Sequence, residues 1–124
     1  MCSSDLQEAA AEAVALPRSY YTELAEEYAA RRTKLLGILE DVGFRCYKPS
    51  GAYYTMADIS AFGFSTDTEF VRHLITEIGV AAVPGSSFFR NPADGHHLVR
   101  FTFCKKEETL DEAGRRLRKL KPRR

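Results

Sequence analysis

The spacing of apolar residues in the first third of the chain predicts two successive helices. Residues 5–15 are rich in alanine, the best helix former, and Asp5 suits the N-cap position. Pro17 is expected to end this helix or to begin the next one. Across residues 19–42 the apolar side chains follow a helical stripe, and Gly43 is placed to end the helix. The stripe consists of Leu24, Tyr28, Leu35, Ile38, Leu39 and Val42.

The rest of the pattern predicts four short strands and two more helices. The strands are expected at residues 44–47, 52–59, 80–83 and 97–103. Thr66 and Glu69 have the spacing of a capping box, so a helix is expected to begin there and to end at Gly79. The last helix, residues 107–120, is acidic at its start and basic at its end, as the helix dipole favours. This order predicts an α+β fold, in which amphipathic helices pack on one face of a small, mostly antiparallel sheet of three to four strands.

Arg100 lies in the middle of the most apolar strand-like run, residues 97–103. Because strand side chains alternate between faces, Val99, Phe101 and Phe103 are expected to share the core face and Arg100 to point the other way. A guanidinium removed from water needs an anion, and its planar fork suits a carboxylate or phosphate held by two parallel hydrogen bonds. Two explanations stay open here: a bound ligand, or an internal aspartate or glutamate.

The other polar residues do not indicate a catalytic reaction beside Arg100. Asp58 is either a turn carboxylate or the internal partner of Arg100. Ser86 lacks the G-x-S-x-G setting of a nucleophilic serine, and no glycine-rich phosphate loop is present. His96 and His97 are adjacent, so on a strand they point to opposite sides and do not share a metal. We therefore expect no metal site.

Composition narrows the classes of partner. The chain has 124 residues with 44% hydrophobic and 28% charged residues, which predicts one globular domain spanning residues 1–124. A net charge of +1 gives no electrostatic reason to expect nucleic acid or a membrane surface, and residues 121–124 are expected to form a basic, solvated tail. Three cysteines without C-x-x-C spacing predict neither a disulfide framework nor a zinc site, and they favour a cytoplasmic location. No run of residues has transmembrane length or a signal-peptide pattern.

Several segments match one known family in their order and spacing. They are Tyr28–Arg32 with the helix that ends at Gly43-Phe44, Pro49–Asp58, Gly79–Phe89, Val99–Lys105 and Thr109–Leu117. Together they resemble the C-terminal small domain of the class I, fold type I aminotransferases, which depend on pyridoxal phosphate. The kynurenine and glutamine aminotransferase branch is the most similar. The resemblance covers residues 6–120, with residues 1–16 as a helical lead-in.

The resemblance implies a role for individual residues. By position in the V-R-F strand, Arg100 forms the bidentate salt bridge to the substrate α-carboxylate. Gly51 and Tyr53 are implied as lining of the substrate pocket, and Phe88 as part of the pocket mouth. The chain would then be the C-terminal fragment of an enzyme that transfers an amino group between an amino acid and a 2-oxo acid.

The motif around the family's Schiff-base lysine does not occur in this sequence. The resemblance therefore implies that the parent enzyme is a homodimer, that pyridoxal 5'-phosphate binds in its large domain, and that this chain alone binds no cofactor and is inactive. The sheet face opposite the helices is then expected to meet the large domain and to expose apolar surface. The alternative is a stand-alone, non-catalytic α+β module that binds a small carboxylate ligand.

Overall fold

Two helices form the first third of the molecule. The computed structural model describes residues 3–122, in which α1 spans Ser3–Val14 and α2 spans Arg18–Val42. Pro17 is the N-cap residue of α2, as its fixed φ of −59° permits. Gly43 ends α2 in a left-handed conformation with φ of 116°, and its N–H donates to the carbonyls of the last turn. Both predicted helices are confirmed; Met1 and Cys2 lie outside the described residues.

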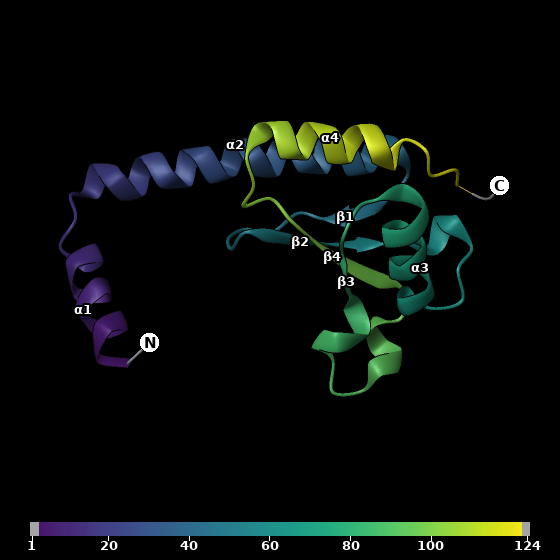
Figure 1. The fold of residues 1–124 in the computed structure, drawn as a ribbon, viewed down its shortest axis with the longest axis horizontal. Helices are drawn as coiled ribbons and strands as arrows, with labels where there is room; N and C mark the ends of the chain where they lie inside the picture. The colour runs from purple at the N-terminus through teal and green to yellow at the C-terminus, as the bar shows by residue number, and fades with distance from the viewer. Residues whose placement is uncertain (1–2, 123–124) are drawn as a thin grey trace.

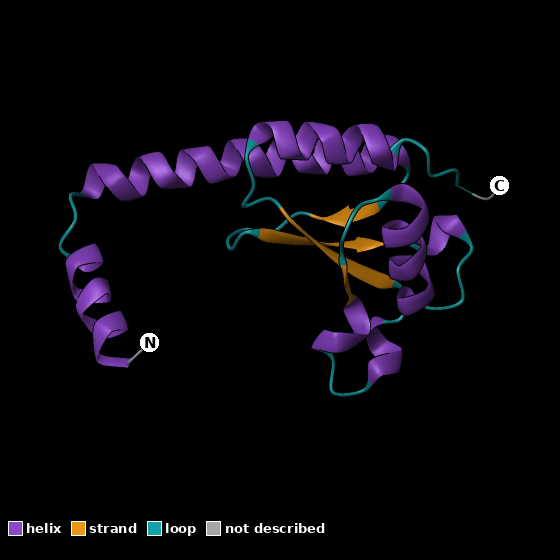
Figure 2. Ribbon diagram, viewed as in Figure 1, coloured by secondary structure: helices purple, strands orange, loops and turns teal. Residues whose placement is uncertain are grey.

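Four antiparallel strands form one sheet in the order β1-β2-β4-β3 (Figures 1 and 2). Strand β1 is Arg45–Tyr47, β2 is Tyr54–Asp58, β3 is Val83–Pro84 and β4 is Leu98–Thr102. The predicted α+β fold is confirmed. All four strands are shorter than predicted, and for β2 and β3 the local reason is visible. Ala52 has φ of 62°, which delays the start of β2, and the N–H of Val80 donates to the Leu74 carbonyl instead of to a strand.

The second half of the chain supplies two further helices and several single turns. Helix α3, Asp67–His73, is capped at Thr66, whose hydroxyl oxygen accepts the N–H of Glu69 at 3.2 Å. It continues as a π-helical turn, η2, at Leu74–Ile78. Helix α4 spans Glu107–Leu117, shorter than the predicted 107–120, because the last residues form hydrogen bonds to the third residue back. The 3₁₀ turns are η1 (Ser60–Phe62), η3 (Gly85–Phe88) and η4 (Pro92–Gly95). The last two lie between β3 and β4, and residues 123–124 of the predicted basic tail lie outside the described residues.

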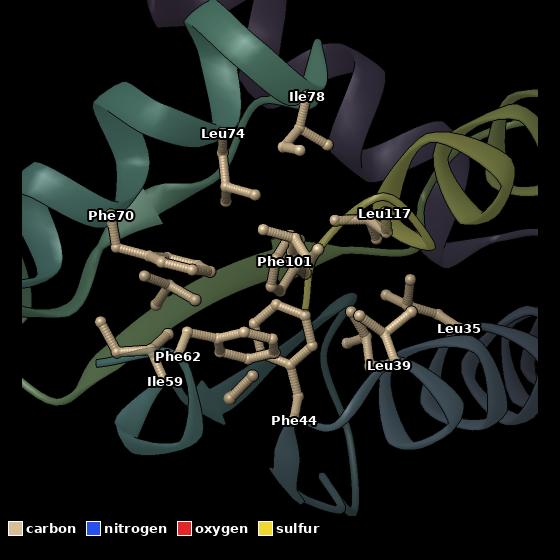
Figure 3. Packing of buried hydrophobic residues seen from close by; sticks show 14 of the residues in the cluster. Leu35, Leu39, Phe44, Ile59, Phe62, Phe70, Leu74, Ile78, Phe101 and Leu117 are labelled. Carbon is tan, nitrogen blue, oxygen red and sulfur yellow. The ribbon is translucent and has the colours of Figure 1, made fainter. Parts of the chain in front are cut away.

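The hydrophobic core fills the space between one face of the sheet and helices α2, α3 and α4 (Figure 3). Leu39, Phe70 and Leu74 are fully buried there. The ring of Phe44 contacts those of Phe62 and Phe101, with centroids 4.7 and 5.3 Å apart. Each such side chain contributes about 1.5–3 kcal/mol by leaving water. This core fixes β4 and therefore the direction in which its side chains point.

The N-terminal arm, defined as residues 3–27, lies outside this core. Every residue of the arm is exposed, and α2 has buried residues only from Leu35 onwards. In Figure 1 the arm extends away from the sheet, with α1 at its far end. The hydroxyl of Tyr21 donates to the carbonyl of Ala13 and so links α2 to α1. The arm nevertheless carries large apolar side chains: Leu6, Val14, Leu16, Tyr20, Tyr21 and Leu24.

Candidate functional site

Arg100 occupies the centre of β4, which lies between β2 and β3. In the register of the sheet it is opposite Met56 of β2 and Val83 of β3. Val99 and Phe101 are buried in the core, whereas Arg100 is half-buried on the other face, as the alternation predicts. The fold therefore places the guanidinium of Arg100 on the face of the sheet that does not carry the core.

Two aromatic rings hold the guanidinium of Arg100. The Cζ atom lies 5.0 Å from the centroid of the Tyr54 ring and 4.5 Å from that of the Phe88 ring. Tyr54 comes from β2 and Phe88 from the turn after β3, so the rings come from elements on either side of β4. Contacts of this kind stabilise an arginine by about 0.5–2 kcal/mol and leave its in-plane N–H groups free to donate.

No internal anion neutralises Arg100 within residues 3–122. Its Nε is buried and has no hydrogen-bond partner there, and the ion pairs in that part of the chain all involve other basic residues. Asp58, the suggested internal partner, accepts the N–H of Ser60 at 2.8 Å and is a turn carboxylate. An unpaired buried donor costs about 1–3 kcal/mol. A bound anion would remove that cost.

The other candidate residues are distributed around this arginine. Phe88 contacts it directly. Tyr53 reaches it through Tyr54, because the two tyrosine rings meet edge to face with centroids 5.5 Å apart. Gly51 lines, with Tyr53, a cleft of about 380 Å³ between α2 and the turn before β2, and Arg100 does not belong to the lining of this cleft. Phe89, the next residue along the chain from Phe88, is exposed.

Arg32 is a contributor to the same cleft that sequence reasoning missed. Its Nη1 donates to the carbonyl of Pro49 at 3.0 Å, which ties the Gly51 turn to α2. Its Nε is buried without a hydrogen-bond partner among the described residues. An arginine on a predicted helix is normally expected in solvent. The sequence signal for the burial of Arg32 is that it lies on the apolar stripe of this helix, between Tyr28 and Leu35.

A larger hollow of about 550 Å³ lies elsewhere, between α4 and the residues that follow η2. Its lining includes Gly79, Thr102, Glu112 and Arg116, and it does not include Arg100. Glu112 accepts hydrogen bonds from Arg115 and Arg116, which lower its pKa to about 2, and Arg116 also donates to the Gly79 carbonyl. These charged groups satisfy one another, so Arg100 is the better candidate for binding an anion.

Cysteine and metal chemistry find no support in residues 3–122. Burial, together with the nearby Glu40 carboxylate, raises the pKa of the Cys46 thiol to about 11, so the thiol stays protonated at neutral pH. Cys46 and Cys104 are free thiols. The described part of the chain holds no group of three or more side chains able to bind a metal ion. Among its helices, none combines the length and the apolar character needed to cross a membrane.

Comparison with known proteins decides the family. The model of the family "Aminotransferase class I and II" matches residues 1–117. The chain belongs to this aminotransferase family. The solved N-succinyldiaminopimelate aminotransferase from Mycobacterium tuberculosis superimposes with a TM-score of 0.84 at 40% identity, covering 93% of this chain and 30% of that one. A solved Escherichia coli protein with methionine aminotransferase function gives a TM-score of 0.76 at 37% identity, covering 82% of this chain and 26% of that one.

The family includes the branch named from the sequence. Kynurenine–oxoglutarate transaminase 1 of Mus musculus is 32% identical over 114 residues, covering 82% of this chain and 27% of the relative. The predicted membership of the aminotransferases is therefore confirmed. The chain spans between about a quarter and a third of the length of these aminotransferases.

Proposed function

We propose that this chain is the C-terminal part of a transaminase that moves an amino group between an amino acid and a 2-oxo acid, and that Arg100 binds the α-carboxylate of the substrate. One observation carries the assignment: Arg100 is held by two rings, has a buried donor and has no internal anion within residues 3–122. Membership of the aminotransferase family supports the reaction class.

The surroundings of Arg100 suit it to orient a carboxylate. A guanidinium and a carboxylate can form two parallel hydrogen bonds, which fix both the position and the rotation of the bound molecule. The contacts with Tyr54 and Phe88 order the arginine before the substrate arrives, so less side-chain entropy is lost on binding. Holding the substrate in one orientation lowers the barrier of every later step at its α-carbon. In this proposal Tyr53 and Gly51 line the pocket wall, and Phe88 lines its mouth.

Pyridoxal 5'-phosphate is the cofactor in this proposal, and when bound it supplies the electron sink for bond changes at the substrate α-carbon. The described residues do not fit this cofactor by themselves. The groups in contact with Arg100 are two aromatic rings, with no amine for a Schiff base. Lys34 is engaged by Asp111 at 2.9 Å, between α2 and α4. The proposal therefore assigns the cofactor and its lysine to a large domain outside this chain. In this proposal the chain alone is inactive.

The exposed apolar side chains support a place for that large domain. The N-terminal arm carries the largest group of them, and Tyr47 and Tyr53 are exposed at the end of the sheet nearest α2. Such surface is usually covered by a partner in a soluble protein. In the proposal the large domain of the same parent covers it, the parent is a cytoplasmic homodimer, and the free thiols of Cys46 and Cys104 suit a reducing compartment.

The second candidate is a stand-alone module that binds a small carboxylate without catalysis. It is favoured by the fact that both rings in contact with Arg100 belong to this chain. Calorimetry of the isolated chain with amino acids and 2-oxo acids separates the two functions. Tight binding by the chain alone supports the module, and its absence supports a site completed by the large domain.

The test of the main proposal is an Arg100→Ala substitution in the complete transaminase. Loss of a charge-assisted pair should lower kcat/KM for the amino acid by about 10- to 150-fold, the equivalent of about 1.5–3 kcal/mol. Arg100→Lys keeps the charge and loses the planar fork, so it should recover only part of this loss. An amine that lacks the α-carboxylate should react equally with all three proteins. An unchanged kcat/KM for the amino acid would exclude Arg100 from carboxylate binding.

A further inference from the structure

Asp67, the first residue of α3, has a fully buried side chain. Buried carboxylates are rare and need hydrogen bonds. Its Oδ2 accepts the N–H of Ser86, which lies 19 residues further along the chain, at 2.7 Å. Burial alone would raise the pKa of Asp67, but hydrogen bonds from Ser86 and Thr68 and the charge of His96 outweigh it and lower the pKa. The carboxylate is therefore ionised at neutral pH and accepts a charge-assisted hydrogen bond.

The hydrogen bond fixes η3, the turn to which Ser86 belongs. The preceding residue, Gly85, packs directly on β4, where a Cβ atom would lie 2.5 Å from the carbonyl oxygen of Leu98. On its other side Gly95 of η4 is equally close, so both positions require glycine. Gly85 is thus held by packing and Ser86 by Asp67, two residues before Phe88. The backbone that leads to Phe88 is therefore anchored at two successive residues.

We propose that Asp67 is a positioning residue for Arg100: by holding Ser86 it keeps the Phe88 ring against the guanidinium. The contacts run from Asp67 to Ser86 at 2.7 Å and from Phe88 to Arg100 at 4.5 Å, joined by the single turn of η3. This proposal deepens the function proposed above. Any effect of Asp67 on substrate binding rests on that function. The coupling between Asp67 and Arg100 does not depend on that function.

A simpler role for Asp67 would be to stabilise the N-terminus of α3 through the helix dipole. Glu69 separates the two roles because it lies in the same first turn and carries the same charge, but its side chain is exposed. Glu69→Ala removes a negative charge near the N-terminus of α3 and leaves the hydrogen bond to Ser86 in place. Asp67→Ala removes both the charge and this hydrogen bond. The pair is a matched control for the proposal.

The test is nuclear magnetic resonance of the whole chain, which reports ring contacts of Arg100 directly. The Nε–H resonance of Arg100 is displaced by the ring currents of its aromatic neighbours, and Phe88→Ala defines how far the signal moves when one ring is lost. Asp67→Ala should move this resonance in the same direction by at least about half as much, while Glu69→Ala should leave it at the wild-type position. A wild-type position in folded Asp67→Ala overturns the proposal.

Asp67→Asn decides the matter if Asp67→Ala does not fold. It keeps an acceptor oxygen but loses the charge, so the Ser86 amide should exchange with solvent about three- to tenfold faster, and the Arg100 signal should move less than in Phe88→Ala. Unchanged exchange and an unchanged signal overturn the proposal. In the complete transaminase, Asp67→Asn should raise KM for the amino acid more than it lowers kcat. If Arg100→Ala leaves kcat/KM for the amino acid unchanged, the proposed function fails, while the spectra still decide the coupling of Asp67 to Arg100.

Discussion

The N-terminal arm and the packed part of the molecule both have helices with large apolar side chains, but these side chains have very different surroundings. In the arm, residues 3–27, all side chains are exposed, including Val14 and Leu24. Further along the same helix α2, Leu35 and Leu39 are buried against the sheet. Helix propensity alone gives marginal stability in water, and most helical stability comes from packing. The difference shows that an apolar helical stripe does not by itself place a segment in the core. In the parent enzyme proposed above, the large domain would cover the apolar side chains of the arm.

The largest difference in the free energy of unfolding should come from the same leucine-to-alanine substitution made once in the core and once in the arm. Leu39→Ala opens a cavity in the core and should lower the free energy of unfolding by about 2–5 kcal/mol. Leu24→Ala, in the arm of the same helix, should change it by less than about 0.5 kcal/mol. Urea denaturation of the chain measures both. Equal losses would show that the arm is packed in solution.

Two glycines of α2 should respond to alanine with opposite signs. Gly43 has φ of 116°, and an added Cβ would lie 2.9 Å from Pro122, so Gly43→Ala should destabilise by about 1–3 kcal/mol. Gly37 is inside the helix with no atom within 4 Å of the added Cβ, so Gly37→Ala should stabilise by about 0.5–1 kcal/mol. Thermal unfolding of the two variants gives the signs. A stabilising Gly43→Ala would contradict the left-handed end of the helix.

Removal of residues 1–16 should leave the packed part intact. Because α1 has no buried residue, the free energy of unfolding should change by less than about 0.5 kcal/mol. Backbone amides of residues 3–14 should exchange rapidly with solvent in the whole chain, while those of Phe70, Val99 and Phe101 should exchange slowly. Slow exchange in α1 would mean that self-association or another contact covers the arm.

The smallest expected effect is a pH dependence that originates in the packed part. The pKa of Asp67 is lowered in the folded chain, so its contribution to stability is fully present above its ordinary value of 3.8 and is lost as the pH falls through the folded value. Asp67→Asn should therefore be less stable than the wild type at pH 7, with a difference that shrinks below pH 3.8. Denaturant titrations at several pH values measure this. A difference that grows as the pH falls would reverse the sign.

The positions of the secondary structure elements could be predicted because they depend on local periodicity. The helical stripe of α2, the capping box at Thr66 and the alternation around Arg100 all use neighbouring residues. Boundaries that depend on distant hydrogen bonds could not be predicted in the same way. The 80–83 run looks like a strand throughout, yet the N–H of Val80 caps the turn before it.

The sequence was enough to choose Arg100 as the central residue of the candidate site. It was not enough to predict which side chains contact Arg100. An arginine in an apolar strand is visible in the sequence, and so is the family resemblance on which its proposed role rests. The ring contacts of Tyr54 and Phe88 depend on how β2 and η3 are placed beside β4. Asp67 looks like an ordinary acidic residue in the first turn of a helix, because Ser86, whose N–H it accepts, lies 19 residues further along the chain.

The two edges of the sheet give the chain a defence against aggregation. An exposed edge strand offers unpaired backbone groups to another chain, and short strands or proline at the edge prevent such pairing. Here β1 has three residues and β3 has two, the second of which is Pro84 and has no N–H to donate. Growth of the sheet from one molecule to the next is therefore blocked on both sides. Any association of the isolated chain should proceed through side chains, remain reversible and dissolve in mild denaturant.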